Sequence, residues 1–222
     1  MTPCCCAPGV RTAVVTGHHP FDVPAFRDLF CALEGVDPFV QHMEDFACSS
    51  PETRAAYDVA LFYNMHMETP GEGGPWYAGN MGAALEELGR AGQGIVVLHH
   101  AILAFPQWPL WSEIVGIADR SFGYHYGETV RSEIVQPDHP ITRGLAPWEM
   151  VDETYTMASA EAGSDILITY DHPRSMNTIA WTRRYKDSRV FCYEAGHDNL
   201  AYADPNFREV VRRGILWVAD DL

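Results

Sequence analysis

Histidine residues in this sequence repeatedly follow short apolar runs. The clearest run is residues 94–98 (Gly-Ile-Val-Val-Leu), which leads directly to His99 and His100. Such a run is typical of a buried parallel strand, and open α/β sheets hold their ligands at the carboxyl ends of their strands. An imidazole in that position can carry a proton near neutral pH or bind a metal ion. The other histidines that follow apolar runs are His18, His19, His66 and His197.

Several of these imidazoles would meet if their strands are parallel, because parallel strands end at one edge of a sheet. A catalytic zinc site needs three protein ligands and a water molecule. His99, His125 and His197 could supply the imidazoles, with a carboxylate such as Glu153 or Asp198. No His-Glu-x-x-His spacing is present, so the sequence does not demand a metal. Imidazoles that only exchange protons, or that only bond to neighbouring backbone, are the alternatives.

Sequence signatures of covalent catalysis and of nucleotide binding are missing. There is no Gly-x-Ser-x-Gly or Gly-x-Cys-x-Gly elbow, and His99 occupies the position after the fourth predicted strand where such an elbow would lie. Cys192 lies within an apolar run and is expected in the core. Residues 71–74 contain an acidic residue among their glycines and do not open a clear helix, so a phosphate loop is not expected. No cofactor is certain, and a divalent metal such as zinc stays open.

Composition narrows the class of partner. The chain of 222 residues has a formal net charge of −15, which argues against nucleic acid and against anionic membranes and favours a small neutral ligand. No apolar stretch approaches the roughly 20 residues that a membrane helix needs. Three of the six cysteines are consecutive, Cys4 to Cys6, and the others lack zinc-ribbon spacing. We therefore expect reduced thiols in a cytoplasmic protein, with the role of Cys4 to Cys6 open.

The apolar periodicity predicts one domain over residues 12–222 after a disordered tail over residues 1–11. Strands alternate with helices in the first half, which favours a doubly wound, mostly parallel α/β sheet. The polar and glycine-containing segments 122–127 and 152–155 are expected to be loops. The strands are expected at residues 12–16, 39–43, 57–63, 94–98, 129–135, 165–170, 178–182 and 189–193, and the main helices at 21–33, 80–89, 108–117 and 206–218.

The ordered set of motifs resembles the ThuA-like (trehalose utilisation) family, whose fold is that of the class I glutamine amidotransferases. The resemblance spans the chain from Thr12 to Trp217. Residues 92–94 and 186–188 depart from the family pattern. The matching residues are 94–99, Trp111, Phe122 with His125, 139–142 with 144–145, 152–155, 180–185, 189–191 with 196–197, and 214–217.

The resemblance implies a flavodoxin-like or amidotransferase-like sheet without the amidotransferase nucleophile, and a link to carbohydrate catabolism. We expect an enzyme that acts on a neutral sugar or keto-sugar, with a homo-oligomer left open. A non-catalytic carbohydrate- or metabolite-binding protein is the main alternative, and the missing nucleophile disfavours a glutamine-type amide hydrolase. The expected catalytic residues are His99, His197 and Glu153; the expected substrate contacts are His18, His19, His125, Trp111 and Tyr155; and the metal ligands, if a metal binds, are His99, His125 and His197.

Overall fold

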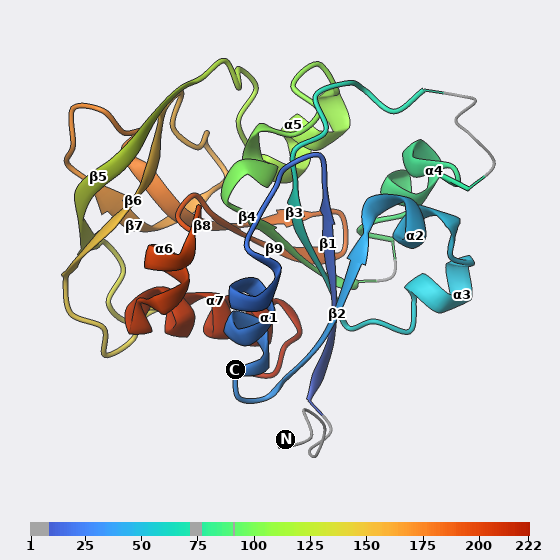
Figure 1. Ribbon diagram of the computed structural model, residues 1–222, viewed down its shortest axis with the longest axis horizontal. Coiled ribbons are helices and arrows are strands. Elements are labelled where there is room, and N and C mark those ends of the chain that lie inside the picture. Colours follow the sequence, from blue (N-terminus) through green and yellow to red (C-terminus); the bar gives the residue numbers. More distant parts are fainter. Residues whose placement is uncertain (1–8, 72–76, 91) are drawn as a thin grey trace.

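The computed structural model describes residues 9–71, 77–90 and 92–222 (Figure 1). Its strands are β1 Val10–Gly17, β2 Val36–His42, β3 Val59–Asn64, β4 Gly94–Leu98, β5 Gly123–Ile134, β6 Trp148–Thr156, β7 Asp165–Tyr170, β8 Thr178–Tyr185 and β9 Ser188–Tyr193. Its helices are α1 Val23–Cys31, α2 Met43–Cys48, α3 Pro51–Arg54, α4 Met81–Glu86, the 3-10 helix η1 His99–Leu103, α5 Pro109–Val115, α6 Asn199–Ala203 and α7 Pro205–Val218. Among the described residues the strands form one sheet, in the order β2-β1-β3-β4-β9-β8-β7-β5-β6.

The first half of the sheet is parallel. Strands β2, β1, β3, β4 and β9 pair in parallel, and one register row runs through Val14, Leu61, Val96 and Phe191. These four side chains are completely buried, because helices cover both faces of the sheet and each strand can therefore be apolar throughout. The row confirms the doubly wound α/β class predicted from the sequence.

Helices lie on both faces of this parallel half (Figure 1). On one face α7 packs against β4 and β9, with α6 and α1 beside it, and on the other α2 packs against β1 and β2. Asp204 caps the amino end of α7, where its Oδ1 accepts from the backbone N–H groups of Asn206 and Phe207. Gly214 allows α7 to approach the sheet closely, because a Cβ there would lie 2.2 Å from the Phe191 ring.

The second half of the sheet is antiparallel. Strands β8, β7, β5 and β6 extend the sheet beyond β9. Segments 122–127 and 152–155 belong almost entirely to β5 and β6, so the prediction of loops there was wrong. An irregular register between His125 and Glu128, with Gly127 at a φ of +67°, breaks the alternation that would have marked β5. In β6 the acidic pair Asp152 and Glu153 is buried, although its composition suggested a turn.

Several boundaries differ from the sequence prediction. Strand β1 begins at Val10, so the last two residues of the predicted tail belong to the sheet. Strand β2 ends at His42, and Met43 begins α2. Residues 1–8, with Cys4 to Cys6, and residues 72–74 of the glycine-containing segment 71–74 lie outside the described part of the chain. No described helix is long and apolar enough to cross a membrane.

Candidate functional site

His99 is the first residue after β4, a strand flanked on both sides by parallel neighbours. Its side chain is completely buried. Its φ is +54°, in the left-handed region that non-glycine residues rarely occupy and that clusters at functional sites. The chain therefore makes a sharp turn from β4 into η1, and an imidazole occupies the turn.

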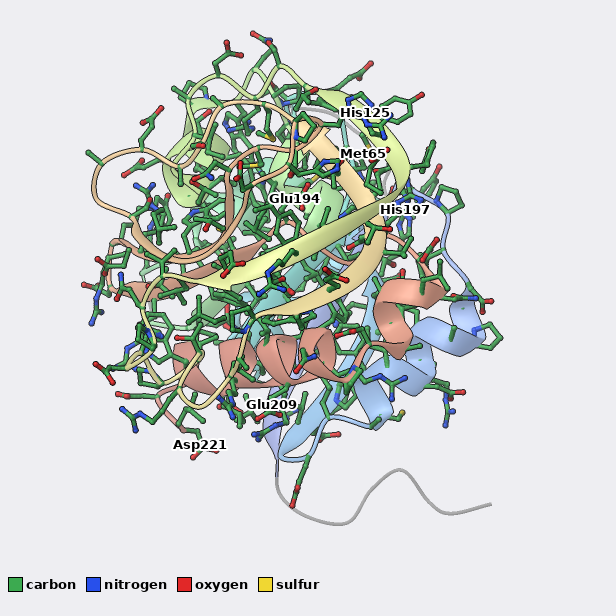
Figure 2. All side chains as sticks on the ribbon, turned by 90° about the vertical axis from the view of Figure 1, so that its left-hand side faces the viewer. Met65, His125, Glu194, His197, Glu209 and Asp221 are labelled. Carbon is green, nitrogen blue, oxygen red and sulfur yellow. The ribbon has the colours of Figure 1, made fainter. Side chains whose placement is uncertain are left out.

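Three side chains from distant segments converge at this turn. His99 Nε2 lies 3.2 Å from His197 Nδ1 and 3.6 Å from Glu153 Oε1. His197 Nδ1 lies 3.5 Å from the same Glu153 oxygen. The residues come from the end of β4, from β6 and from the loop after β9, and Figure 2 shows His197 beside the β5 and β6 ribbons. We call His99, Glu153 and His197 the triad.

The hydrogen bonds of His99 fix its tautomer. Its Nδ1 lies 2.6 Å from the backbone oxygen of Glu194, and because a carbonyl oxygen only accepts, Nδ1 must donate. In the neutral ring, Nε2 therefore holds a lone pair that faces the other two triad residues and the Tyr155 hydroxyl, 2.8 Å away. A backbone bond at one ring nitrogen commonly orients the other toward a metal.

The spacing of the triad fits a tetrahedral metal site. Ligand atoms about 2.1 Å from a tetrahedral ion lie about 3.4 Å from one another, and the three separations are 3.2, 3.5 and 3.6 Å. The two contacts with Glu153 exceed an ordinary hydrogen bond, which is about 2.7–3.2 Å long. Two imidazoles and one carboxylate with room for a further ligand match the donor set of catalytic zinc.

Two buried carboxyl groups lie next to the triad and hold the segments that carry it. Asp152 Oδ1 accepts from the backbone N–H groups of His197, at 3.0 Å, and Glu153, at 2.9 Å. Its Oδ2 accepts from Gly196 N–H at 2.7 Å. Burial raises the pKa of Asp152 to about 6, even though these bonds favour the charged form. Asp152 thus locks the loop that carries His197 against the strand that carries Glu153.

Glu194 is the second buried carboxyl group. Its backbone oxygen holds His99, and its side-chain Oε1 accepts from Tyr155 N–H at 2.9 Å. Its Oε2 is buried and has no partner among the described residues. Burial raises the pKa of Glu194 to about 8, with the charge of Asp152 adding to the shift and His99 opposing it. Glu194 is therefore mostly protonated at neutral pH.

The triad residues have pKa values that are shifted in different directions. Burial alone would lower the pKa of His99, but the nearby carboxylates outweigh it and the pKa is raised. Burial and the charge of His99 lower the pKa of His197. Burial would raise the pKa of Glu153, but the bond and charge of His99 lower it. Such divergence within one cluster is typical of functional sites.

The family follows from the sequence over nearly its whole length. The model of the ThuA family, described as trehalose utilisation, matches residues 11–218. The chain belongs to the ThuA family. No curated protein sequence matches it.

Solved structures agree with the ThuA fold. A ThuA-like protein from Parabacteroides merdae is 20% identical with a TM-score of 0.70, covering 95% of this chain and 90% of that one. A ThuA-like protein from Bacteroides uniformis is 16% identical with a TM-score of 0.71, covering 98% and 95%. A glutamine amidotransferase from Thermotoga maritima is 8% identical with a TM-score of 0.52, covering 95% and 99%. The amidotransferase-like fold expected of a ThuA protein is therefore confirmed.

Two further residues predicted from the sequence lie against the triad. Tyr155 contacts His99 through its hydroxyl and is almost completely buried. The His19 ring lies 5.6 Å from the His197 ring and stacks on His100 at 4.1 Å. Burial, followed by the charge of His99, lowers the pKa of His19, so its imidazole is neutral at neutral pH.

The other three predicted residues lie outside the triad. Trp111 is completely buried, donates to the Ala101 carbonyl at 2.9 Å and packs against Phe62, so we assign it to the core in place of the expected substrate contact. His18 stacks on His66 at 3.8 Å in a separate cluster. His125 joins neither group of converging metal-ligating side chains among the described residues, and Figure 2 places it toward one end of β5.

Three contributors were missed as site residues. Asp152 belongs to an acidic pair expected to be in a loop, and Glu194 lies within the segment that leads to His197 without any signature of its own. Tyr126 follows His125 directly in the sequence and was not among the expected site residues. Its ring lies 5.2 Å from the His197 ring, and its side chain is exposed. The signal available for all three was their closeness in sequence to residues that had been identified.

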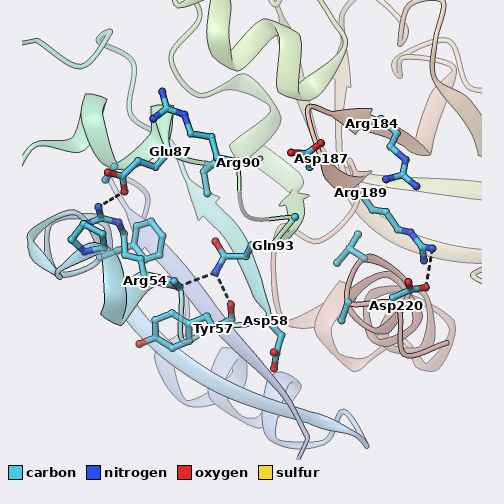
Figure 3. Close-up of a pocket in the computed structure, with 18 residues that line it drawn as sticks. Arg54, Tyr57, Asp58, Glu87, Arg90, Gln93, Arg184, Asp187, Arg189 and Asp220 are labelled. Carbon is cyan, nitrogen blue, oxygen red and sulfur yellow. Dashed lines mark hydrogen bonds and ion pairs between the residues drawn. The ribbon is translucent and has the colours of Figure 1, made fainter.

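A separate cavity of about 590 Å³ lies at the opposite edge of the sheet, beside the amino ends of β4 and β9 (Figure 3). Much of its lining is charged, and several charges are paired. Arg54 Nη2 contacts Glu87 at 2.5 Å, and Arg189 Nη2 contacts Asp220 at 2.8 Å. Because the triad lies at the carboxyl ends of the parallel strands, this cavity and the triad are on different sides of the ThuA fold.

Proposed function

We propose that this chain is a cytoplasmic, metal-assisted enzyme that acts on a small neutral carbohydrate carrying a carbonyl group, a keto-sugar. The observation that carries the proposal is the spacing of His99 Nε2, Glu153 Oε1 and His197 Nδ1. Their separations match the distance between two ligand atoms of a tetrahedral metal ion. A divalent ion held there would polarise a carbonyl oxygen of the sugar.

The residues of the chain would position the reacting groups. His99 is held by the Glu194 carbonyl, so its Nε2 keeps one direction. His197 is the most exposed triad residue, so substrate would approach from its side. His19, a neutral imidazole beside His197, would accept the proton of the carbon next to the carbonyl group. That C–H bond breaks, its electron pair forms the new C=C bond, and the π pair of the carbonyl group moves to the carbonyl oxygen, so an enediolate forms. The proton on His19 can exchange with water before a proton returns to the same carbon and the keto-sugar is restored.

The surroundings of the triad support a neutral sugar as substrate. The net charge of −15 disfavours phosphorylated sugars. Tyr124 and Tyr126 are exposed, their rings lie 5.3 Å apart, and Tyr126 is close to His197. Tyrosine rings offer an apolar face with a polar edge, which suits the apolar face of a sugar ring. The description of the family, trehalose utilisation, supports carbohydrate chemistry.

Proton exchange in D2O tests the proposal. Zinc-loaded protein should catalyse the entry of deuterium at the carbon next to the carbonyl group of a neutral keto-sugar. Proton NMR measures this exchange as the loss of the signal from that carbon's proton. His19→Gln should lose about 10²–10⁴-fold in exchange rate while retaining zinc. His197→Gln should lose the zinc ion of the triad and the exchange activity. His139→Gln, a histidine outside the cluster, is the matched control and should keep both.

Two results would contradict the proposal. Exchange that survives complete chelation of the metal would show that the triad works without an ion. Equal sugar binding by the native protein and by His99→Ala, with no exchange in either, would favour a non-catalytic carbohydrate-binding protein on the same scaffold.

A further inference from the structure

A second group of imidazoles and a carboxylate lies at the same edge of the sheet. His18 follows β1, Glu44 lies in the first turn of α2, and His66 follows β3. One ligand atom from each lies within 4.8 Å of the others. His42, the last residue of β2, contacts Glu44 through its Nδ1. We propose that His18, Glu44 and His66 form a second site for a divalent transition-metal ion such as Zn²⁺, with His42 beside it.

The backbone brings these residues together because three neighbouring parallel strands end side by side. In the register, Thr16 of β1 pairs with His42 of β2, and Gly17 pairs with Asn64 of β3. Gly17 allows the rings to close over the end of β1. A Cβ there would lie 2.9 Å from His66 Cε1 and 3.0 Å from His42 Nε2. The glycine thus leaves space that the two imidazoles fill.

His66 carries an unpartnered polar atom. The residue is only 6% exposed, and its Nε2 has no hydrogen-bond partner among the described residues. Asn64 Nδ2 lies 3.1 Å from His66 Nδ1, while Asn64 Oδ1 is also buried without a partner. Turning the Asn64 amide by half a turn would let Oδ1 accept the Nδ1 proton of His66. His66 Nε2 would then hold a lone pair and would gain a partner once an ion binds.

His18 has the freedom to complete the site. His18 is exposed, and its ring stacks on His66 at 3.8 Å. Its φ is +58°, close to that of His99, so each cluster contains a left-handed histidine directly after a parallel strand.

Imidazole and carboxylate donors suit zinc and its neighbours better than magnesium or calcium. The ligand atoms would need to approach from at most 4.8 Å to about 3.4 Å for tetrahedral coordination, a movement that the exposed His18 ring can supply. An ion there would tie together the ends of β1, β2 and β3. Because the unfolded chain lacks this geometry, binding should also stabilise the fold.

Metal stoichiometry tests the second site separately from the triad. The full chain, with its thiols alkylated so that cysteines do not contribute, is dialysed against Zn²⁺ and its zinc content is measured. We expect two equivalents for the native protein and for the control His139→Gln. His18→Ala and Glu44→Gln should each bind one equivalent, and so should the triad variant His197→Ala. Combining His18→Ala with His197→Ala should remove both.

The outcomes separate the two sites. In one outcome the native protein binds only one equivalent of zinc, which His197→Ala loses and His18→Ala keeps. That result overturns the second site and leaves the proposed function standing. One equivalent lost only in His18→Ala supports the second site and removes the metal from the proposed function. No bound zinc, or unchanged stoichiometry in both His18→Ala and Glu44→Gln, overturns the second site. His18 and Glu44 are not fully buried, so their variants should fold, which circular dichroism verifies before dialysis.

Discussion

Replacing Glu194 by Gln should change how the stability of the protein depends on pH. The carboxyl group is completely buried, and burial raises its pKa from an ordinary value of 4.5 to about 8. In the folded protein Glu194 therefore keeps its proton over a range in which the unfolded chain loses it. The stabilisation from this group is complete below pH 4.5 and is lost as the pH rises toward 8.

The magnitude follows from the same pKa values. A change of one in pKa corresponds to about 1.4 kcal/mol. The free energy of unfolding should therefore fall by about 2 to 5 kcal/mol between pH 4.5 and 8, with the lower figure applying if water enters the site and weakens the effect of burial. Gln keeps an oxygen for the bond from Tyr155 N–H and does not titrate. Glu194→Gln should therefore match the native protein near pH 4.5 and exceed its free energy of unfolding by a growing amount up to pH 8.

Urea unfolding at pH 4.5, 6 and 8 in the presence of a chelator measures this difference. Glu149→Gln, the same exchange at an exposed position of β6, is the control and should leave the pH dependence unchanged. A constant difference between Glu194→Gln and the native protein over this range would refute the reasoning, because it would show that Glu194 does not titrate differently in the two states.

Three further substitutions test the scaffold by thermal or urea unfolding. Asp204→Ala removes the cap of α7 and should cost about 1 kcal/mol; a neutral result would show that the cap is dispensable. Gly214→Ala forces a Cβ against Phe191 and should lower the free energy of unfolding by about 1–3 kcal/mol. An increase in stability would show that α7 and the sheet can move apart to accommodate the methyl group. Trp111→Phe should lower stability but leave zinc content unchanged, and loss of zinc without loss of stability would return Trp111 to the site.

The parallel half of the fold could be predicted because its signal is local. The strand at residues 94–98 is short, apolar and β-branched, and its position in the sheet follows from alternation with helices. His99 at its end was therefore accessible to sequence reasoning. Its left-handed backbone and its bond to the Glu194 carbonyl were not, because both depend on how β4 lies against β9.

The antiparallel half depends on pairing between distant segments. Glu153 reaches the triad because β6 pairs with β5. The acidic pair Asp152 and Glu153 suggested an exposed turn, because nothing in the neighbouring sequence indicates that these charged residues are buried. The irregular register after His125 shows why a neighbouring residue was missed. His125 was expected in the site, but Tyr126 is the residue that contacts His197, and a bulge changes which side chains share a face.

The most direct test of the triad is anomalous diffraction at the zinc edge from crystals grown with Zn²⁺. The account predicts a zinc peak about 2.0–2.2 Å from His99 Nε2, His197 Nδ1 and Glu153 Oε1, with His99 Nδ1 still donating to the Glu194 carbonyl. Crystals that hold zinc elsewhere on the protein, with no peak among these three atoms, would contradict the claim that they form a metal centre.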